Sequence, residues 1–267
     1  MRVLNFIKVA GYDILSAFNN YHLFLTLGWQ DVATKYRRSR IGAFWITIGM
    51  SVSITTMGVV FGQLFEQPMA EFLPFVSIGS IFWGFFSSNI GDGCNGFIAA
   101  SGIILQVRMP LFVHVMRVLW RNLIILGHNI MIVPIVFLFF SKPVSLVALL
   151  AIPGFILFVI NLSWMMLVLS VVCARYRDFP PIVINAVGIL FFLTPIMWNE
   201  TTIPDRTNFL MLNYNPFYHL ISIVRAPLLG FTPTVANWVY ACVMGLVGWS
   251  IALIIFGRYR NRIPYWL

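Results

Sequence analysis

Charged residues are what this sequence has least of. They make up only 9% of its 267 residues, while hydrophobic residues make up 60% and the mean hydropathy is +0.89. A soluble domain carries roughly a quarter charged residues. The shortage of charge therefore excludes an ordinary soluble fold and indicates an integral membrane protein.

Motifs that bind nucleotides or metals, or that catalyse reactions, are also absent. The sequence has no GxxxxGK[ST] loop, no GxGxxG after a strand and no HExxH pair, and its four histidines do not pair at metal-ligand spacing. Cys94, Cys173 and Cys242 lie far apart in apolar surroundings and are expected to be reduced packing residues. We therefore expect a chain that is not an enzyme and binds no cofactor itself.

Acidic residues are missing from the centres of the apolar windows. Asp92 and Asp178 lie at the ends of such windows, and Glu66 and Glu71 lie between two of them. A transporter driven by protons or sodium would need an ionisable side chain at mid-membrane depth. The sequence thus disfavours a self-powered transporter, and energy for uphill transport would have to come from a partner.

Six windows without charge are long enough for spanning helices, which need about 20 apolar residues. The third is expected to begin near Pro110 and to carry Arg117 and Arg121 in its first turns. The windows are 41–65, 72–91, 122–141, 143–174, 179–199 and 226–257. We predict an all-α membrane protein with one domain over 1–267, divided into an interface segment (1–41), a six-span bundle (42–257) and a tail (258–267).

Positive charge orients these spans. If both termini are cytosolic, 14 of the 17 lysines and arginines fall on the cytosolic side, and only Lys142, Arg206 and Arg225 do not. This is the distribution of the positive-inside rule, so we predict N-in and C-in. The same dispersal leaves no basic groove, and a nucleic-acid partner is not expected.

The first 20 residues do not read as a cleaved signal peptide, because Lys8 and Asp13 interrupt their apolar residues. Val3, Phe6 and Ala10 instead recur at helical spacing. This pattern predicts an amphipathic helix on the membrane surface.

Three segments carry a family resemblance. "TLGWQDVATKYRRSRIGAFW" (26–45) has a tryptophan, an aspartate, a tyrosine, a serine, a glycine and a tryptophan in a characteristic order, with Gln30 in place of the usual basic residue. "RYRD" (175–178) and "TPI.W" (194–198) are the most specific matches, and "NYNPFYHLISIVRAPLLG" (213–230) is the third segment. Together they resemble the ABC-2 type permeases that export bacterial surface polysaccharides, above all the O-antigen and capsule exporters.

The resemblance implies a homodimer of permeases in the bacterial inner membrane, joined to two separate ATPase subunits that bind ATP and Mg²⁺. It also implies a glycan linked to a lipid such as undecaprenyl diphosphate, which the complex exports from the cytosol. Membrane lipids surround the permease.

The basic cluster before the first span would then receive the lipid diphosphate. A helix over about 21–40 would hold the cluster at headgroup depth, and arginine's planar donors suit phosphate. Simple anchoring of the first span is the alternative. The residues expected to act where the substrate enters are Lys35, Tyr36, Arg37, Arg38, Arg40 and Trp45.

The loop after the second span, 91–110, is too apolar to be a free cytosolic loop. We predict a short helix near 96–107 that docks in a groove of the ATPase, with residues 174–178 as a second contact. The alternatives are packing against the spans and, for the arginines, anchoring. The residues expected to couple the subunits are Phe97, Ile98, Ile104, Arg108, Arg175, Arg177 and Asp178.

The outer segment between the fifth and sixth spans is expected to form short re-entrant helices that close the exit. Asn215 can cap a helix that starts at Pro216. Arg225 should pair with a carbonyl, or with Glu200 or Asp205, because its surroundings are apolar. A connector lying on the surface is the alternative.

Family analogy places the first and fifth spans at the dimer axis, where sugars would slide past rings and small hydroxyls. Helix packing is the alternative for the small residues. The residues expected along the path are Thr47, Ser51, Thr55, Asn185, Phe191, Phe192, Thr194 and Trp198.

Other functions stay open at this point. A related exporter could carry a hydrophobic small molecule or drug. A membrane enzyme acting on polyprenyl-phosphate sugars would need paired acids at the membrane surface, but the inner acids are scattered. A passive channel is not supported, because rings of charge are absent. For the glycan, O-antigen, capsule and teichoic acid remain alternatives.

Overall fold

The computed structural model describes residues 2–37, 41–42, 44–198 and 212–267, and every regular element within them is a helix. This confirms the all-α prediction. The elements are α1 (Arg2–Asn19), α2 (Tyr21–Tyr36), α3 (Phe44–Leu64), α4 (Met69–Cys94), α5 (Gly96–Ala99), α6 (Ser101–Gln106), α7 (Phe112–Asn129), α8 (Ile132–Phe139), η1 (Leu146–Leu150), α9 (Ala151–Arg175), α10 (Phe179–Leu193), α12 (Pro216–Leu228), α13 (Val235–Tyr259), η3 (Arg260–Arg262) and α14 (Ile263–Trp266).

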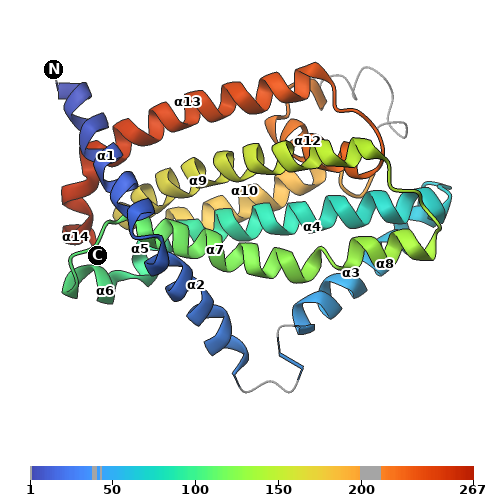
Figure 1. Cartoon of the computed structure of the whole chain (residues 1–267), viewed down its shortest axis with the longest axis horizontal. Coiled ribbons are helices and arrows are strands. Elements are labelled where there is room, and N and C mark those ends of the chain that lie inside the picture. The colour runs from blue at the N-terminus through green and yellow to red at the C-terminus, as the bar shows by residue number, and fades with distance from the viewer. Residues whose placement is uncertain (1, 38–40, 43, 199–211) are drawn as a thin grey trace.

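The long helices α4, α7, α9 and α13 run side by side along the long axis (Figure 1). Both chain ends lie at one end of this bundle, together with α1, α5, α6 and α14. We call this the termini end. The α3–α4 connection lies at the opposite end, which we call the far end, and α12 lies on that side of the molecule (Figure 1).

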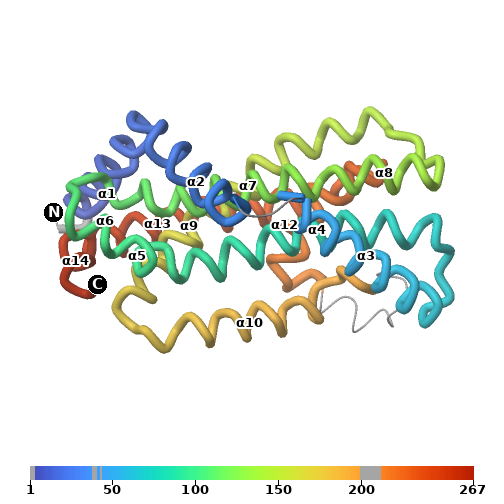
Figure 2. The backbone as a smooth tube through the Cα atoms, turned by 90° about the horizontal axis from the view of Figure 1, so that it is seen from below, coloured from blue at the N-terminus to red at the C-terminus, as the bar shows by residue number. Residues whose placement is uncertain are grey.

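Five helical stretches are long and apolar enough to cross a membrane: 44–64, 69–94, 112–139, 146–175 and 235–266. The chain is therefore a multi-pass membrane protein. The remaining predicted span coincides with α10, which is apolar but has only 15 residues, fewer than the roughly 20 that a crossing requires. Figure 2 shows α10 running beside α4 at the edge of the bundle.

Proline and glycine explain where the helices depart from the predicted windows. α10 stops before Thr194, whose backbone is extended because Pro195 follows it. Pro134 in α8 lacks the N–H that would continue the helix from α7. The last predicted span is present as α13, but it starts later than the window 226–257: Gly230 has a φ of +88°, and α13 begins only after Thr234, whose side chain caps it.

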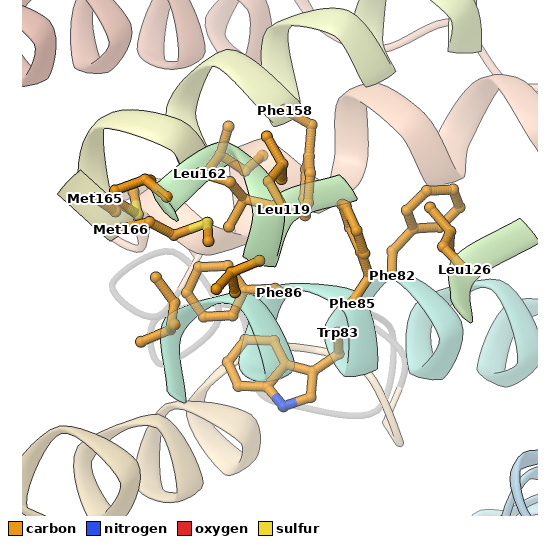
Figure 3. Packing of buried hydrophobic residues seen from close by; sticks show 14 of the residues in the cluster. Phe82, Trp83, Phe85, Phe86, Leu119, Leu126, Phe158, Leu162, Met165 and Met166 are labelled. Carbon is orange, nitrogen blue, oxygen red and sulfur yellow. The ribbon is translucent and has the colours of Figure 1, made fainter. Parts of the chain in front are cut away.

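The core lies between α4, α7 and α9 (Figure 3). Phe82 and Phe85 of α4 meet Phe158 of α9 with ring centroids 6.1 Å apart. Glycines allow close approach elsewhere, since a Cβ at Gly248 would collide with the Trp164 ring. In lipid, such packing rather than water exclusion holds helices together, and it makes a firm scaffold for the polar side chains at both ends.

Candidate functional site

The basic cluster lies where α2 ends and α3 begins. Lys35 and Tyr36 are the last residues of α2, Arg37 follows them, and exposed Trp45 is in the first turn of α3. Arg38 and Arg40 lie outside the described residues. The predicted interface helix over 21–40 is present as α2, but one of its faces is buried against α7 rather than turned to lipid.

α2 approaches α7 closely enough to exclude a side chain at Gly28, where a Cβ would lie 2.8 Å from the carbonyl oxygen of Arg117. Beside this contact, Arg117 donates two hydrogen bonds to the Asp31 carboxylate, of 2.8 Å from Nε and 2.5 Å from Nη2. Both side chains are mostly buried. The aspartate of the 26–45 motif therefore fastens α2 to α7, which the sequence analysis did not anticipate.

Asp92 makes the corresponding link between α4 and α7. Its Oδ2 lies 2.7 Å from Nη2 of Arg121 and accepts a 3.1 Å hydrogen bond from Asn122. Arg117 and Arg121 were predicted only as positive charges that orient the third span. In the structure they neutralise acids on two different helices.

Asp13 of α1 is buried and ties three helices together. Its carboxylate accepts hydrogen bonds from the backbone N–H groups of Leu111 (3.3 Å) and Phe112 (3.0 Å) at the start of α7. Nε of Arg260, just after α13, donates to it at 2.6 Å. The carboxylate thereby satisfies otherwise open donors at a helix N-terminus.

The segment predicted to couple to an ATPase forms two short helices, α5 and α6, at the termini end (Figure 1). Phe97 is fully buried in the core, so it presents no surface to a partner. Ile98 and Ile104 are half-buried. The exposed apolar residues of the segment are instead Leu105 and Val107.

Arg108 lines a cavity of about 670 Å³ between this segment, α1 and the tail. Of the predicted second contact, Arg177 donates a 3.3 Å hydrogen bond to the carbonyl oxygen of Leu267. Arg175 lies over the rings of Tyr176 and Trp266, 5.3 and 5.2 Å from their centroids. Asp178 is exposed and forms no ion pair with a described residue.

A groove of about 670 Å³ separates α4 from α10. Phe191 and Phe192, two of the predicted path residues, line it from α10, and Asn185 is exposed on the same helix. α4 contributes the polar side, which the sequence analysis did not assign to the path. The α4 residues of the groove are Trp83, Ser87, Ser88, Gly91 and Asp92, and Asn95 follows directly after α4.

The predicted path residues of α3 divide between packing and open surface. The Thr47 hydroxyl donates a 3.3 Å hydrogen bond to the carbonyl oxygen of His128, so Thr47 faces α7. Ser51 is half-buried and Thr55 is exposed. Gly58 and Gly62, in the same row of small residues, face α4.

On the far side, by which we mean the half of the bundle towards the far end, Asn215 joins α12 to the end of α10. Its Oδ1 accepts hydrogen bonds from the backbone N–H groups of Phe217 (3.0 Å) and Tyr218 (3.3 Å), which confirms the predicted cap before Pro216. Its Nδ2 donates a 3.0 Å hydrogen bond to the hydroxyl of buried Thr194. One side chain therefore links both elements.

Arg225 makes the second link. It is 4% exposed, its Nη1 donates to the carbonyl oxygen of Pro195, and its guanidinium lies 4.1 Å from the centroid of the Phe75 ring. The predicted pairing with a carbonyl is confirmed, while Glu200 and Asp205 lie outside the described residues. Trp198 is also buried here and donates a 3.1 Å hydrogen bond to the carbonyl oxygen of Phe192.

Comparison with known proteins gives consistent matches. The family model described as "ABC-2 type transporter" matches residues 22–229. An O-antigen export system permease protein RfbA of Myxococcus xanthus is 25% identical over 207 residues, covering 76% of this chain and 79% of its own. A protein of the same name from Klebsiella pneumoniae is 22% identical over 250 residues, with 91% and 93% covered.

Proposed function

Because the chain belongs to the ABC-2 type transporter family, we propose that it is the permease subunit of an exporter that moves a lipid-linked polysaccharide of the O-antigen type across the bacterial inner membrane. The observation that carries the proposal is the alignment with the Klebsiella pneumoniae O-antigen permease, which extends over 91% of the chain. A permease is not an enzyme, and ATP hydrolysis takes place on a separate subunit.

In this proposal the termini end is cytosolic and α10, extended by residues 194–198, completes a sixth crossing. The excess of arginine and lysine in the segments assigned to the cytosol supports this orientation. α12 is then a re-entrant helix on the outer side, and its links to Thr194 and Pro195 close the exit.

Two copies of the chain assemble through α3 and α10. α3 supports this assignment because only 11% of its most apolar stretch is buried, compared with 67% for α4. The groove between α4 and α10 opens beside this surface and combines the rings of Trp83 and Phe191 with the hydroxyls of Ser87 and Ser88. Rings pack on the apolar faces of sugars, and hydroxyls bond to their edges, so this groove suits a moving glycan.

The lipid diphosphate enters at the basic cluster around Lys35 and Arg37. Both are exposed at the end of α2, and lysine and arginine are the side chains that recognise phosphate. The bidentate Asp31–Arg117 pair supports this role, because it holds the end of α2 in a fixed place beside α7.

ATPase subunits bind the α5–α6 segment. Exposed Leu105 and Val107 offer an apolar contact, and Arg108 lies beside them at the cavity. A helix seated in a groove of a partner is a common mode of recognition.

The test reconstitutes the chain with its ATPase in proteoliposomes and measures ATP-dependent movement of lipid-linked glycan. Leu105→Glu should reduce export at least about tenfold while leaving the fold intact, because one charge in an apolar contact costs several kcal/mol. Gln106→Glu is the matched control, since it adds the same charge to an exposed polar position. Full export by Leu105→Glu would contradict the coupling role.

The same vesicles test the substrate. Transport of glycan without any ATPase would contradict the proposed energy source. Movement of a hydrophobic dye but not of glycan would favour the alternative, an exporter of small molecules.

A further inference from the structure

A second cavity at the termini end, apart from the groove and from the basic cluster, is lined by three arginines. It has a volume of about 530 Å³ and lies where α9, α13 and α14 meet, with α1 contributing Phe6. Figure 1 shows these helix ends gathered at the left of the molecule, whereas the end of α2 lies at the bottom. Nothing in the proposed transport path uses this cavity.

Its charge comes from Arg175 at the end of α9, Arg258 in the last turn of α13 and Arg262 in η3. None of the three forms an ion pair with a described residue, whereas Arg117, Arg121 and Arg260 do. Three cations around one cavity repel one another unless an anion lies between them.

The acids of the termini end do not supply that anion. Asp13 binds Arg260, Asp31 binds Arg117 and Asp92 binds Arg121. Asp178 is exposed, does not line the cavity and forms no ion pair with a described residue.

Aromatic rings hold two of the guanidinium groups. The guanidinium of Arg175 lies 5.2 Å from the centroid of the Trp266 ring, and that of Arg258 lies 5.5 Å from that of Tyr259. Stacking on a ring occupies the flat face of a guanidinium and leaves its N–H edge able to donate. Such edges match the oxygens of a phosphate.

The aromatic side chains of Tyr176, Tyr259 and Trp266 also line the cavity, and its remaining lining is apolar: Phe6, Val171, Val172 and Ile255. The negative ends of the α9 and α13 dipoles also lie here and oppose any bound anion, so the arginines alone would hold a small free anion weakly. A ligand with both a phosphate and a hydrocarbon part can pair with the arginines and also pack against the apolar lining. Tyrosine and tryptophan are the residues typical of headgroup depth.

We propose that this cavity binds the phosphate headgroup of a lipid. The same chemistry is offered by an anionic phospholipid and by an isoprenoid diphosphate, and the experiment separates these two sources. The site does not depend on the export of a polysaccharide.

The experiment uses the full chain in detergent and measures its affinity, by native mass spectrometry, for dioctanoyl phosphatidylglycerol, dioctanoyl phosphatidylcholine and farnesyl diphosphate. We expect the first or the third to bind more tightly than phosphatidylcholine, and the tighter of these two identifies the source. Replacing Arg258 and Arg262 together by glutamine should weaken that binding by about 25-fold, because each arginine near a lipid phosphate contributes about fivefold.

Lys8→Gln is the control, because it removes one exposed positive charge of α1 that lies outside the cavity. It should change affinity less than about twofold, and Arg258→Gln alone should lower it about fivefold. Equal binding of phosphatidylglycerol, farnesyl diphosphate and phosphatidylcholine would overturn the proposal. Unchanged lipid affinity in the double variant would also overturn it. If the double variant lost only its binding to the ATPase, the arginines would be a contact with that protein and not a lipid site. Because these arginines are exposed, the variants should keep their fold, and size-exclusion chromatography checks it.

Discussion

The two ends of the bundle are held together by different chemistry. At the termini end, three carboxylates each bind an arginine from another element: Asp13 binds Arg260, Asp31 binds Arg117 and Asp92 binds Arg121. On the far side, the links between α10 and α12 end on hydroxyl and carbonyl oxygens rather than on carboxylates. There, Asn215 bonds to Thr194, and Arg225 bonds to the carbonyl oxygen of Pro195.

This difference matters because the two kinds of link differ in what their loss costs. Removing the buried carboxylate of an ion pair, as at Asp13, costs about 3–5 kcal/mol. A hydrogen bond contributes about 1 kcal/mol between neutral groups and about 1.5–3 kcal/mol when one group is charged. In the proposed function, the end tied by ion pairs is the one that receives force from the ATPase subunit. The end tied by a few hydrogen bonds is the one that opens as the exit.

Among variants that test the difference between the two ends, Asp13→Ala should have the largest effect on stability. It leaves two backbone donors of α7 and the Arg260 guanidinium without their acceptor. We expect a loss of about 3–5 kcal/mol in the free energy of unfolding, measured by denaturant titration in detergent micelles. Asp178→Ala is the control, because this acid is exposed and makes no ion pair with a described residue. Equal stability of the two variants would mean that the termini end does not depend on its ion pairs.

Arg225→Met should have the next largest effect, confined to the far side. The variant keeps an apolar stem but loses the bond to Pro195 and the contact with Phe75. A hydrogen bond from a charged group contributes about 1.5–3 kcal/mol. Amides of residues 190–198 should therefore exchange with deuterium faster by about one to two orders of magnitude.

The exchange rates of peptides over 112–121, at the start of α7, should not change in Arg225→Met. Lys142→Met is the control, because it also replaces a basic residue on the far side, and its exchange rates should equal those of the unchanged protein. Faster exchange throughout the chain would show that the two ends are not independent.

Asn215→Ala should have the smallest effect, about 1 kcal/mol, through loss of the cap of α12. Thr194→Val separates the two functions of Asn215, because it keeps the acceptor for the cap but removes the hydroxyl to which Nδ2 donates. Exchange rates of α12 amides should rise in Asn215→Ala only, while those at 194–198 should rise in both variants. If Thr194→Val left 194–198 unchanged, the bond between Asn215 and Thr194 would carry no stability.

Local patterns in the sequence predicted much of this arrangement. Apolar windows located the helices α3, α4, α9 and α13, because a long run of apolar residues has few other stable forms in lipid. The cap at Asn215 and the carbonyl partner of Arg225 followed from the needs of a helix start and of a buried charge.

The ion pairs could not be predicted in the same way. Asp31 and Arg117 are 86 positions apart, and Asp13 and Arg260 are 247 apart, so only the packing of whole helices brings them together. The burial of Phe97 was missed for a related reason: an apolar loop residue can serve a partner or the core, and the choice depends on how α5 lies against α7 and α9.

One feature of α7 joins the two proposed sites of action. Its Arg117 fixes α2 beside the basic cluster, and its first residues are bound to Asp13 next to the loop that follows α6. In the proposed function, substrate arrival and ATPase binding therefore both act on α7. Thermodynamic linkage requires that any shift of α7 produced by one binding event alters the affinity of the other by the same factor.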